Sequence, residues 1–146
     1  MPFTPEQIAA LWEIQDEPWV DTVLVFLYTG FRLMELLNMQ TEQVDLQQKT
    51  FQGGIKTAAG KGRIVPIHPK ILPFVQAWAQ HGHKYLITAD GKKLSKQKYY
   101  ECWAEVMDRI GADKTPHEAR HTFETSLDNA KANRKCIDLL MGHKSK

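Results

Sequence analysis

The chain has 146 residues, of which 42% are hydrophobic and 25% are charged, and its formal net charge is +2. These values are typical of a globular protein and exclude a disordered one, and the length fits one domain over residues 1–146. No apolar run is long enough to cross a bilayer, and the N-terminal residues MPFTPEQ have none of the features of a signal peptide. We therefore expect a soluble, cytoplasmic protein without a membrane partner.

Charge is unevenly distributed along the chain. Residues 1–50 carry two basic and eight acidic side chains, a net charge of −6, whereas residues 51–146 carry seventeen basic and nine acidic ones, a net charge of +8. Clustered lysines and arginines gain affinity for nucleic acids by displacing counterions from phosphates. The second half is therefore a candidate for binding a polyanion, with a mixed solvated surface as the simpler alternative.

Helices are predicted over most of the N-terminal part. Residues 4–15 begin with Thr4 as a helix cap and place apolar residues at helical spacing. Residues 20–30 are apolar on all sides and fit either a strand or a buried helix, but their length and the closing Gly30 favour a helix. A third, shorter helix is predicted over residues 31–39.

The middle of the chain favours β-structure. Short β-favouring pieces at residues 43–46, 50–55 and 62–67 alternate with turn-forming residues, which predicts a small antiparallel sheet. Helices return in the C-terminal half, at residues 69–82, at residues 95–111, from Thr115 and from about Asn133. The expected fold class is therefore α+β: a mostly helical bundle with a small antiparallel β-sheet.

The segment TPHEARHTF, which starts at Thr115, fits two chemical patterns. Read as H-E-x-x-H, His117 and His121 lie one helical turn apart and could bind zinc, with Glu118 as general base. Read as H-x-x-R, His117 and Arg120 share one helix face and could bind a phosphate. Thr115 and Glu118 also form a capping-box pattern, which would place His117 at an exposed helix N-terminus that favours an anion. A capped surface helix with incidental histidines is the third interpretation.

Basic residues mark other candidate positions. Arg32, in TGFRLMEL, begins a helix where the helix dipole disfavours an uncompensated cation, and Glu35 lies three residues later on the same face. In a cleft, Glu35 would orient the guanidinium for bidentate phosphate binding, whereas on the surface the pair would imply no function. Further lysines are expected at another helix start, where they indicate either phosphate contacts or a solvated charge run: Lys92, Lys93, Lys96 and Lys98.

A basic hairpin is predicted around the turn TAAGKG. Lys56 ends one strand beside this turn, and Lys61 and Arg63 follow it. A mobile hairpin of this kind could carry a general acid or contact phosphates, and a solvated tip rich in lysine is the alternative. Near the C-terminus, His143 follows the helix stop Gly142 and by itself fits a capping imidazole.

Four of these segments occur in a familiar order. LYTGFRLMELLNM, IKTAAGKGRIVPI, TPHEARHTFETSLDNA and IDLLMGHKS together resemble the catalytic domain of the tyrosine recombinases, the integrase family of phages and transposons. The resemblance is collinear and covers nearly the whole chain. It implies a bacterial or phage-encoded enzyme that cuts and rejoins double-stranded DNA through a 3′-phosphotyrosine, together with other protomers on the DNA and without a metal or cofactor.

The resemblance also implies a role for each residue of a phosphate pocket. Arg32 and Arg120 would clamp the non-bridging oxygens of the scissile phosphate, and Glu35 would orient the pocket. His117 and His143 would hydrogen-bond the phosphate and assist proton transfer. Lys56 would be the general acid for the 5′-hydroxyl leaving group.

One residue of the family pattern is not found in this sequence. The nucleophilic tyrosine of the family follows the last pattern histidine by about nine residues, roughly two and a half helical turns, whereas this sequence ends at Lys146. We therefore expect a chain that has the phosphate pocket and binds DNA but cannot cleave it alone, and that also lacks the N-terminal DNA-clamping domain of the family. Two alternatives stay open: a non-catalytic DNA-binding remnant or regulator, and an H-E-x-x-H zinc metalloprotease, although no glutamate follows Glu124 to act as third zinc ligand.

Overall fold

The structure is a computed structural model that describes residues 1–52 and 64–129. Several predictions concern residues outside these ranges. They are the turn TAAGKG, the helix from about Asn133, and the candidate site residues Lys56, Lys61, Arg63 and His143.

The N-terminal part of the chain forms the predicted helices. Helix α1 (Pro5–Glu13) begins at a capping box, in which the Gln7 N–H donates to the Thr4 hydroxyl and the Thr4 N–H donates to the Gln7 side chain. Helix α2 (Val20–Thr29) ends at Gly30, whose φ of 69° lies in the left-handed region that glycine adopts without strain. The choice between strand and helix for this apolar segment is thereby settled in favour of a helix.

The predicted antiparallel sheet is confirmed and has three short strands. It follows helix α3 (Leu33–Leu37) and the 3₁₀ helix η1 (Thr41–Gln43), and its strands are β1 (Val44–Asp45), β2 (Thr50–Gln52) and β3 (Ile64–Pro66). The strands pair in the order β1-β2-β3, with Phe51 opposite both Val44 and Val65. Phe51 is buried and its ring meets that of Phe31 edge-on at 5.2 Å, which joins the sheet to the segment just before α3.

The C-terminal half contains one element that the sequence interpretation missed. Between helices α4 (Leu72–Gln80) and α5 (Lys96–Ile110), strands β4 (Thr88–Ala89) and β5 (Lys92–Lys93) form a two-stranded hairpin. Asp90 and Gly91 close its turn with φ of 54° and 77°, and an Asp-Gly pair with positive φ is a strong hairpin signal. The prediction that Lys92 and Lys93 stand at a helix start was therefore wrong, whereas Lys96 does begin α5.

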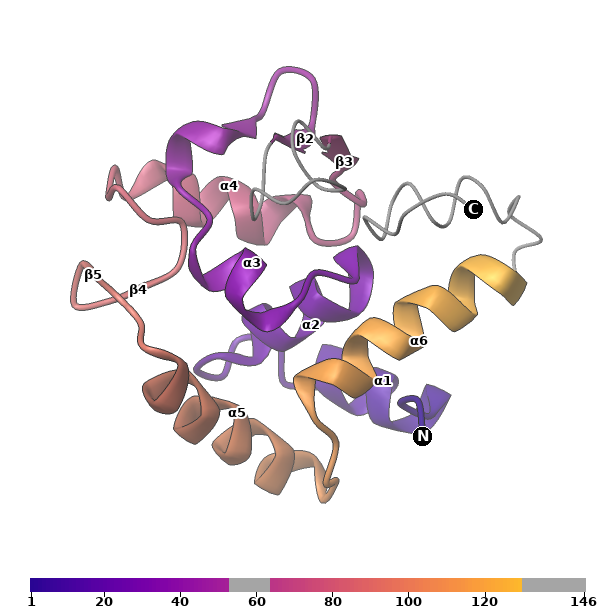
Figure 1. Cartoon of the computed structure of the whole chain (residues 1–146). Coiled ribbons are helices and arrows are strands. Elements are labelled where there is room, and N and C mark those ends of the chain that lie inside the picture. The colour runs from indigo at the N-terminus through magenta and orange to yellow at the C-terminus, as the bar shows by residue number, and fades with distance from the viewer. Residues whose placement is uncertain (53–63, 130–146) are drawn as a thin grey trace.

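Helix α2 lies at the centre of the fold, and this position explains why its side chains are hydrophobic on all sides. Its side chains from Val20 to Leu27 are buried except that of Asp21, and α1, α5 and α6 (Pro116–Asn129) all pack against it. Figure 1 shows this arrangement, with α5 and α6 below and beside α2 and the sheet and α4 above it. The described part of the chain is therefore a mostly helical bundle with small antiparallel sheets, as the sequence predicts.

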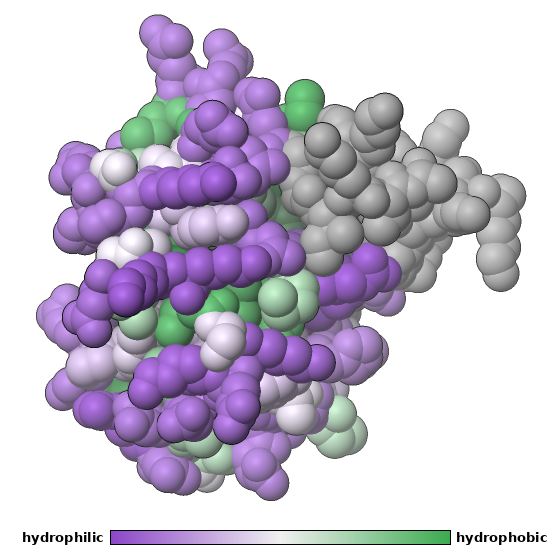
Figure 2. Space-filling model, turned by 60° about the vertical axis from the view of Figure 1, so that its left-hand side comes forward, coloured by the Kyte–Doolittle hydropathy of each residue, from purple (hydrophilic) through white to green (hydrophobic). Residues whose placement is uncertain are grey.

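One face of the molecule is predominantly hydrophilic. Figure 2 shows one face on which hydrophilic side chains predominate and hydrophobic atoms are visible mainly in the hollows between them. Among the helices of residues 1–52 and 64–129, none is both long and apolar enough to pass through a membrane.

Candidate functional site

Helix α6 begins with the predicted capping box. The Glu118 N–H donates to the Thr115 hydroxyl at 3.2 Å, and the Thr115 N–H donates to the Glu118 carboxylate at 3.1 Å. Pro116 takes the first helical position, where its lack of an N–H costs no hydrogen bond because an N–H there has no acceptor within the helix. The cap thus places His117 in the first turn and Arg120 in the second, at the positive end of the helix dipole.

Glu118 has further structural contacts. Its carboxylate lies 3.2 Å from the amine of Met1 and 3.8 Å from the Lys114 ammonium. Burial raises the pKa of Glu118, but hydrogen bonds from the Met1 amine and from Thr115 outweigh it, so the pKa lies below its usual value. Glu118 therefore acts in holding the start of α6, which competes with the role of general base that a zinc protease would require.

The zinc interpretation also depends on a third ligand near the two histidines. His117 and His121 are exposed and line the same cavity. Within residues 1–52 and 64–129, no group of three or more histidine, cysteine, aspartate or glutamate side chains is placed to hold a metal ion. The geometry of the described residues gives this interpretation no support.

Arg120 is a buried arginine with defined partners. Its side chain is 8% exposed, and its Nη1 donates to the carbonyl oxygen of Gly30 at 2.6 Å. The same nitrogen lies 3.9 Å from Oε1 of Glu35, whose side chain is 4% exposed. A buried guanidinium needs such partners because leaving it uncompensated would be very unfavourable. The end of α2 and the start of α3 therefore fix Arg120 in place.

Arg32 lies directly before α3 and is exposed. Its backbone N–H donates to Oε1 of Glu35 at 2.8 Å, which is the part of a capping box that a glutamate three residues later can form. The Glu35 carboxylate thus contacts the backbone of one arginine and the side chain of the other. This geometry adds a partner, Arg120, that the sequence interpretation of Glu35 did not include.

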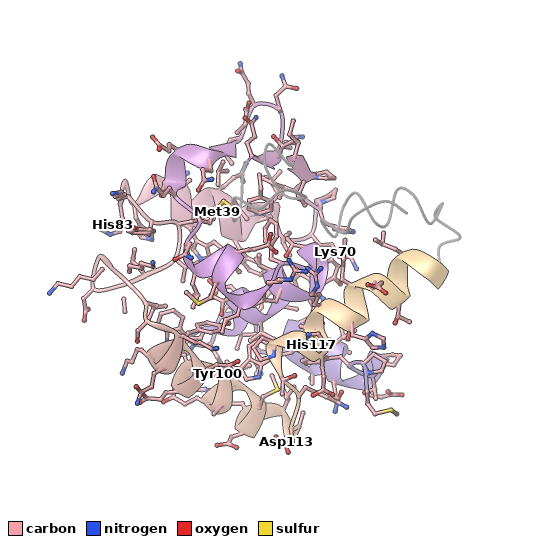
Figure 3. All side chains as sticks on the ribbon, in the orientation of Figure 1. Met39, Lys70, His83, Tyr100, Asp113 and His117 are labelled. Carbon is pink, nitrogen blue, oxygen red and sulfur yellow. The ribbon has the colours of Figure 1, made fainter. Side chains whose placement is uncertain are left out.

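A cavity of about 530 Å³ brings the predicted residues together. It opens beside the N-terminal end of α6, and Figure 3 shows His117 and Tyr100 there, on α6 and α5 respectively. Its walls come from the segment around α3, from α5 and from α6: Phe31, Arg32, Leu33, Tyr100, Pro116, His117, Arg120, His121 and Glu124. Of the site residues predicted within the described ranges, Arg32, His117 and Arg120 line this cavity, and Glu35 contacts both arginines without lining it.

Three lining residues with polar groups, His121, Glu124 and Tyr100, were not predicted as members of a phosphate pocket. His121 and Glu124 could have been found from the sequence, because positions four and seven residues after His117 lie on the same helix face. Tyr100 comes from α5, and nothing in the sequence indicates which surface of α5 meets the start of α6.

The four lysines proposed as phosphate contacts separate into two groups. Lys92 and Lys93 lie on the β4–β5 hairpin, and the Lys93 ammonium is 5.3 Å from the ring centroid of Tyr85. Lys96 and Lys98 lie in the first turn of α5, and the Lys96 ammonium is 6.0 Å from the ring centroid of Tyr100. Lys96 is therefore linked to the cavity through Tyr100.

Two tyrosines have structural roles that occupy their hydroxyl groups. The Tyr99 hydroxyl hydrogen-bonds that of Thr22 at 2.8 Å, and complete burial raises the pKa of Tyr99. The Tyr28 hydroxyl accepts a hydrogen bond from the Trp12 indole at 3.2 Å. Tyr100, by contrast, is 43% exposed and lines the cavity.

The cavity combines features that suit a tetrahedral oxyanion. Two guanidiniums approach it, one fixed and one exposed, and an imidazole stands at the positive end of a helix. Phe31, Leu33 and Pro116 supply apolar walls, which lower the local dielectric and strengthen the attraction between the arginines and an anion. The arrangement can hold a phosphate and stabilise added negative charge on it.

Comparison with known protein families shows to which family the chain belongs. Residues 3–146 match the model of the family described as "Phage integrase family". The chain belongs to the phage integrase family. Its family membership accords with the order of motifs along the sequence and with the mostly helical fold.

Curated relatives of this phage integrase family chain are tyrosine recombinases. It is 31% identical over 137 residues to tyrosine recombinase XerC of Proteus mirabilis, a match that covers 84% of this chain and 43% of that protein. It is 30% identical over 131 residues to tyrosine recombinase XerA of Thermococcus kodakarensis, covering 83% of this chain and 45% of that protein. The matches therefore extend over less than half the length of these relatives.

Solved structures of similar fold cover almost the whole chain. The crystal structure of XerA recombinase has a TM-score of 0.85 at 24% identity, covering 99% of this chain and 57% of that one. The integrase of the Tn1549 transposon, in complex with circular intermediate DNA, has a TM-score of 0.82 at 23% identity, covering 99% and 58%. These likenesses establish the fold of the integrase-family chain.

Proposed function

We propose that this chain is the catalytic part of a site-specific DNA recombinase and that its cavity binds the phosphate at which a DNA strand is exchanged. The observation that carries the proposal is the convergence of Arg32, His117 and Arg120 on one cavity in a chain of the phage integrase family. Double-stranded DNA as the partner is supported by neighbours of the same fold, since the Tn1549 integrase is described with circular intermediate DNA and a lambda integrase dimer with a core site.

The proposed mechanism assigns charge stabilisation to the two arginines. Arg120, held by Gly30 and Glu35, would donate to one non-bridging oxygen of the scissile phosphate, and the exposed Arg32 would close on another. His117 would donate to the same phosphate from the start of α6. Phosphoryl transfer needs positioning and charge neutralisation above all, so this set can act without a metal ion.

The chemical step would be a transesterification. A tyrosine hydroxyl would give up its proton, with the pocket histidines assisting the transfer, and its oxygen would form a bond to phosphorus while the bond to the 5′-oxygen breaks. A general acid would give the departing 5′-oxygen a proton. Reversal of the step by another 5′-hydroxyl would rejoin the strands. Lys56 as the acid and His143 as a second phosphate donor are proposals that concern residues outside the described ranges.

The nucleophilic tyrosine expected from the family is not among the 146 residues, because no tyrosine follows His143 in this sequence. We propose that the 146 residues alone bind DNA without forming the covalent link. Incubation with a nicked, labelled duplex, followed by a denaturing gel, should show no labelled protein. A covalent adduct would contradict this, and its position would identify the tyrosine responsible, for which Tyr100 is the one that lines the cavity among the described residues.

Fluorescence anisotropy with a labelled duplex tests the binding proposal. We expect binding that weakens steeply with salt and an Arg32→Ala variant whose log–log salt slope is smaller by about one unit, because one phosphate contact is lost. Arg109→Ala is the matched control, since Arg109 is an exposed arginine on α5 that pairs with Glu17 and does not line the cavity. Equal salt slopes for the two variants would overturn the proposal that the cavity binds the phosphate.

A further inference from the structure

Tyr100 has no evident part in the packing of the fold. It is 43% exposed, whereas the adjacent Tyr99 is fully buried against Phe26 and Trp103. A partly exposed aromatic side chain on the wall of a cavity is placed to contact a ligand that binds there. Tyr100 lines the cavity together with Arg32 and Arg120, so the ligand that it would meet is the DNA whose phosphate this cavity is proposed to bind.

Lys96 is the second member of this arrangement. It occupies the first position of α5, after the cap Ser95, and Tyr100 follows four residues later on the same helix face. The Lys96 ammonium lies 6.0 Å from the centroid of the Tyr100 ring, at the outer limit of a cation–π contact. A lysine in the first turn of a helix is disfavoured by the helix dipole, so an anion near this position would relieve the repulsion.

We propose that Tyr100 is a positioning residue that holds the Lys96 ammonium at the edge of the phosphate cavity. Lys96 would then bind a phosphate of the same DNA strand next to the one held by Arg32 and Arg120. The proposal rests on the proposed function and deepens it, because it assigns the cavity a second phosphate contact and identifies the residue that orients it. A free lysine side chain would lose more rotamer freedom on binding than one already held against a ring.

Comparison with two other lysines shows how the pair of Lys96 and Tyr100 differs from them. Lys98 lies in the same turn of α5 and is also exposed, but no aromatic ring contact is found for it within the described structure. Lys93 does lie over a ring, that of Tyr85, but Tyr85 does not line the cavity. Lys96 alone among the described lysines combines a ring contact with a partner on the cavity wall.

The test measures the affinity of the 146-residue chain for a labelled duplex by anisotropy at 0.1 M salt and at a series of salt concentrations. Lys96→Met should weaken binding about eightfold, the effect of one phosphate contact at this salt concentration. Tyr100→Leu should weaken it about two- to fivefold, the range of a surface cation–π contact, and Tyr100→Phe should restore affinity because the ring is retained.

A double-mutant cycle separates positioning from an independent contact. If Tyr100 acts through Lys96, Tyr100→Leu should have no further effect once Lys96 is methionine. In a second cycle, Lys98→Met should weaken binding by the same factor whether residue 100 is tyrosine or leucine. Thermal unfolding should change little in each variant, since Tyr100, Lys96 and Lys98 are exposed.

Two results would overturn the inference and leave the proposed function standing. One is an unchanged affinity for Tyr100→Leu in a protein whose affinity does fall with Arg32→Ala. The other is a Tyr100→Leu effect that persists at full size in the Lys96→Met background. An Arg32→Ala variant that binds DNA as tightly as the Arg109→Ala control would instead overturn the proposed function, and the inference with it.

Discussion

The two arginines of the cavity are the same residue type in opposite situations. Arg32 is exposed and contributes to the fold through its backbone N–H, which donates to Glu35. Arg120 is buried and contributes through its side chain, which donates to Gly30 and approaches the same Glu35. One arginine is therefore free to follow a ligand, whereas the other is part of the structure that the ligand meets.

This difference separates binding from stability at a single site. Removing the exposed side chain should affect the ligand alone, while removing the buried one should affect the fold first and the ligand as a consequence. An alanine substitution at either position would lower DNA affinity, so a binding assay alone would not separate the two causes. Stability and affinity therefore have to be measured together for each variant.

The largest effect is expected for Arg120→Ala. It would leave the buried Glu35 carboxylate without this cation and the Gly30 carbonyl without its donor, so unfolding free energy should fall by about 3–5 kcal/mol. Denaturant unfolding followed by circular dichroism measures this. Arg120→Lys, which keeps the charge, should be less destabilised, and equal stability of Arg120→Ala and the parent chain would break the contrast between the two arginines.

Gly30→Ala tests the backbone that presents the carbonyl group to Arg120. Because Gly30 has a φ of 69°, a side chain there should be destabilising by about 1–2 kcal/mol. Gly30→Asn is the control, since asparagine tolerates this conformation better than alanine does. If alanine and asparagine were tolerated equally well, the left-handed conformation would not be what selects glycine at this position.

Thr115→Ala should have a smaller effect, at the other end of the site. Loss of the hydroxyl that caps α6 should lower the unfolding free energy by about 1 kcal/mol. Thr115→Ser retains a capping hydroxyl and should remain close to the parent chain in the same denaturant experiment. A full loss in the serine variant would mean that the threonine methyl group, and not the cap, stabilises the start of α6.

Arg32→Ala should have the smallest effect on stability, within about 0.5 kcal/mol, because the hydrogen bond to Glu35 comes from the backbone and survives the substitution. Its effect on DNA affinity should nevertheless exceed that of Arg109→Ala. A large loss of stability in this variant would show that the guanidinium of Arg32 is structural as well, and the two arginines would no longer differ in kind.

The sequence allowed the prediction of features that depend on neighbours along the chain. Thr4, Ser95 and Thr115 cap helices as predicted, because a cap requires only a short polar side chain and an N–H two or three residues later. Gly30 ends α2 for a similarly local reason. The common face of His117 and Arg120 also follows from helical spacing alone.

Features that depend on distant contacts were not accessible in the same way. The Gly30 carbonyl that binds Arg120 lies ninety residues away in sequence, and no local pattern indicates that this arginine is buried. Tyr99 and Tyr100 are adjacent, yet one is in the core and the other on the cavity wall, because the packing of α5 decides which side faces the site. The β4–β5 hairpin was different, since its Asp90–Gly91 turn was present as a local signal.

The hydrogen bond between Arg120 and the end of α2 has a consequence for the energetics of recognition. A free arginine would lose side-chain entropy and part of its hydration when it binds an anion. Arg120 has already undergone both changes during folding, because Gly30 and Glu35 hold its guanidinium in a buried position. The end of the central helix therefore preorganises Arg120, and an incoming phosphate needs to order only the side chain of Arg32.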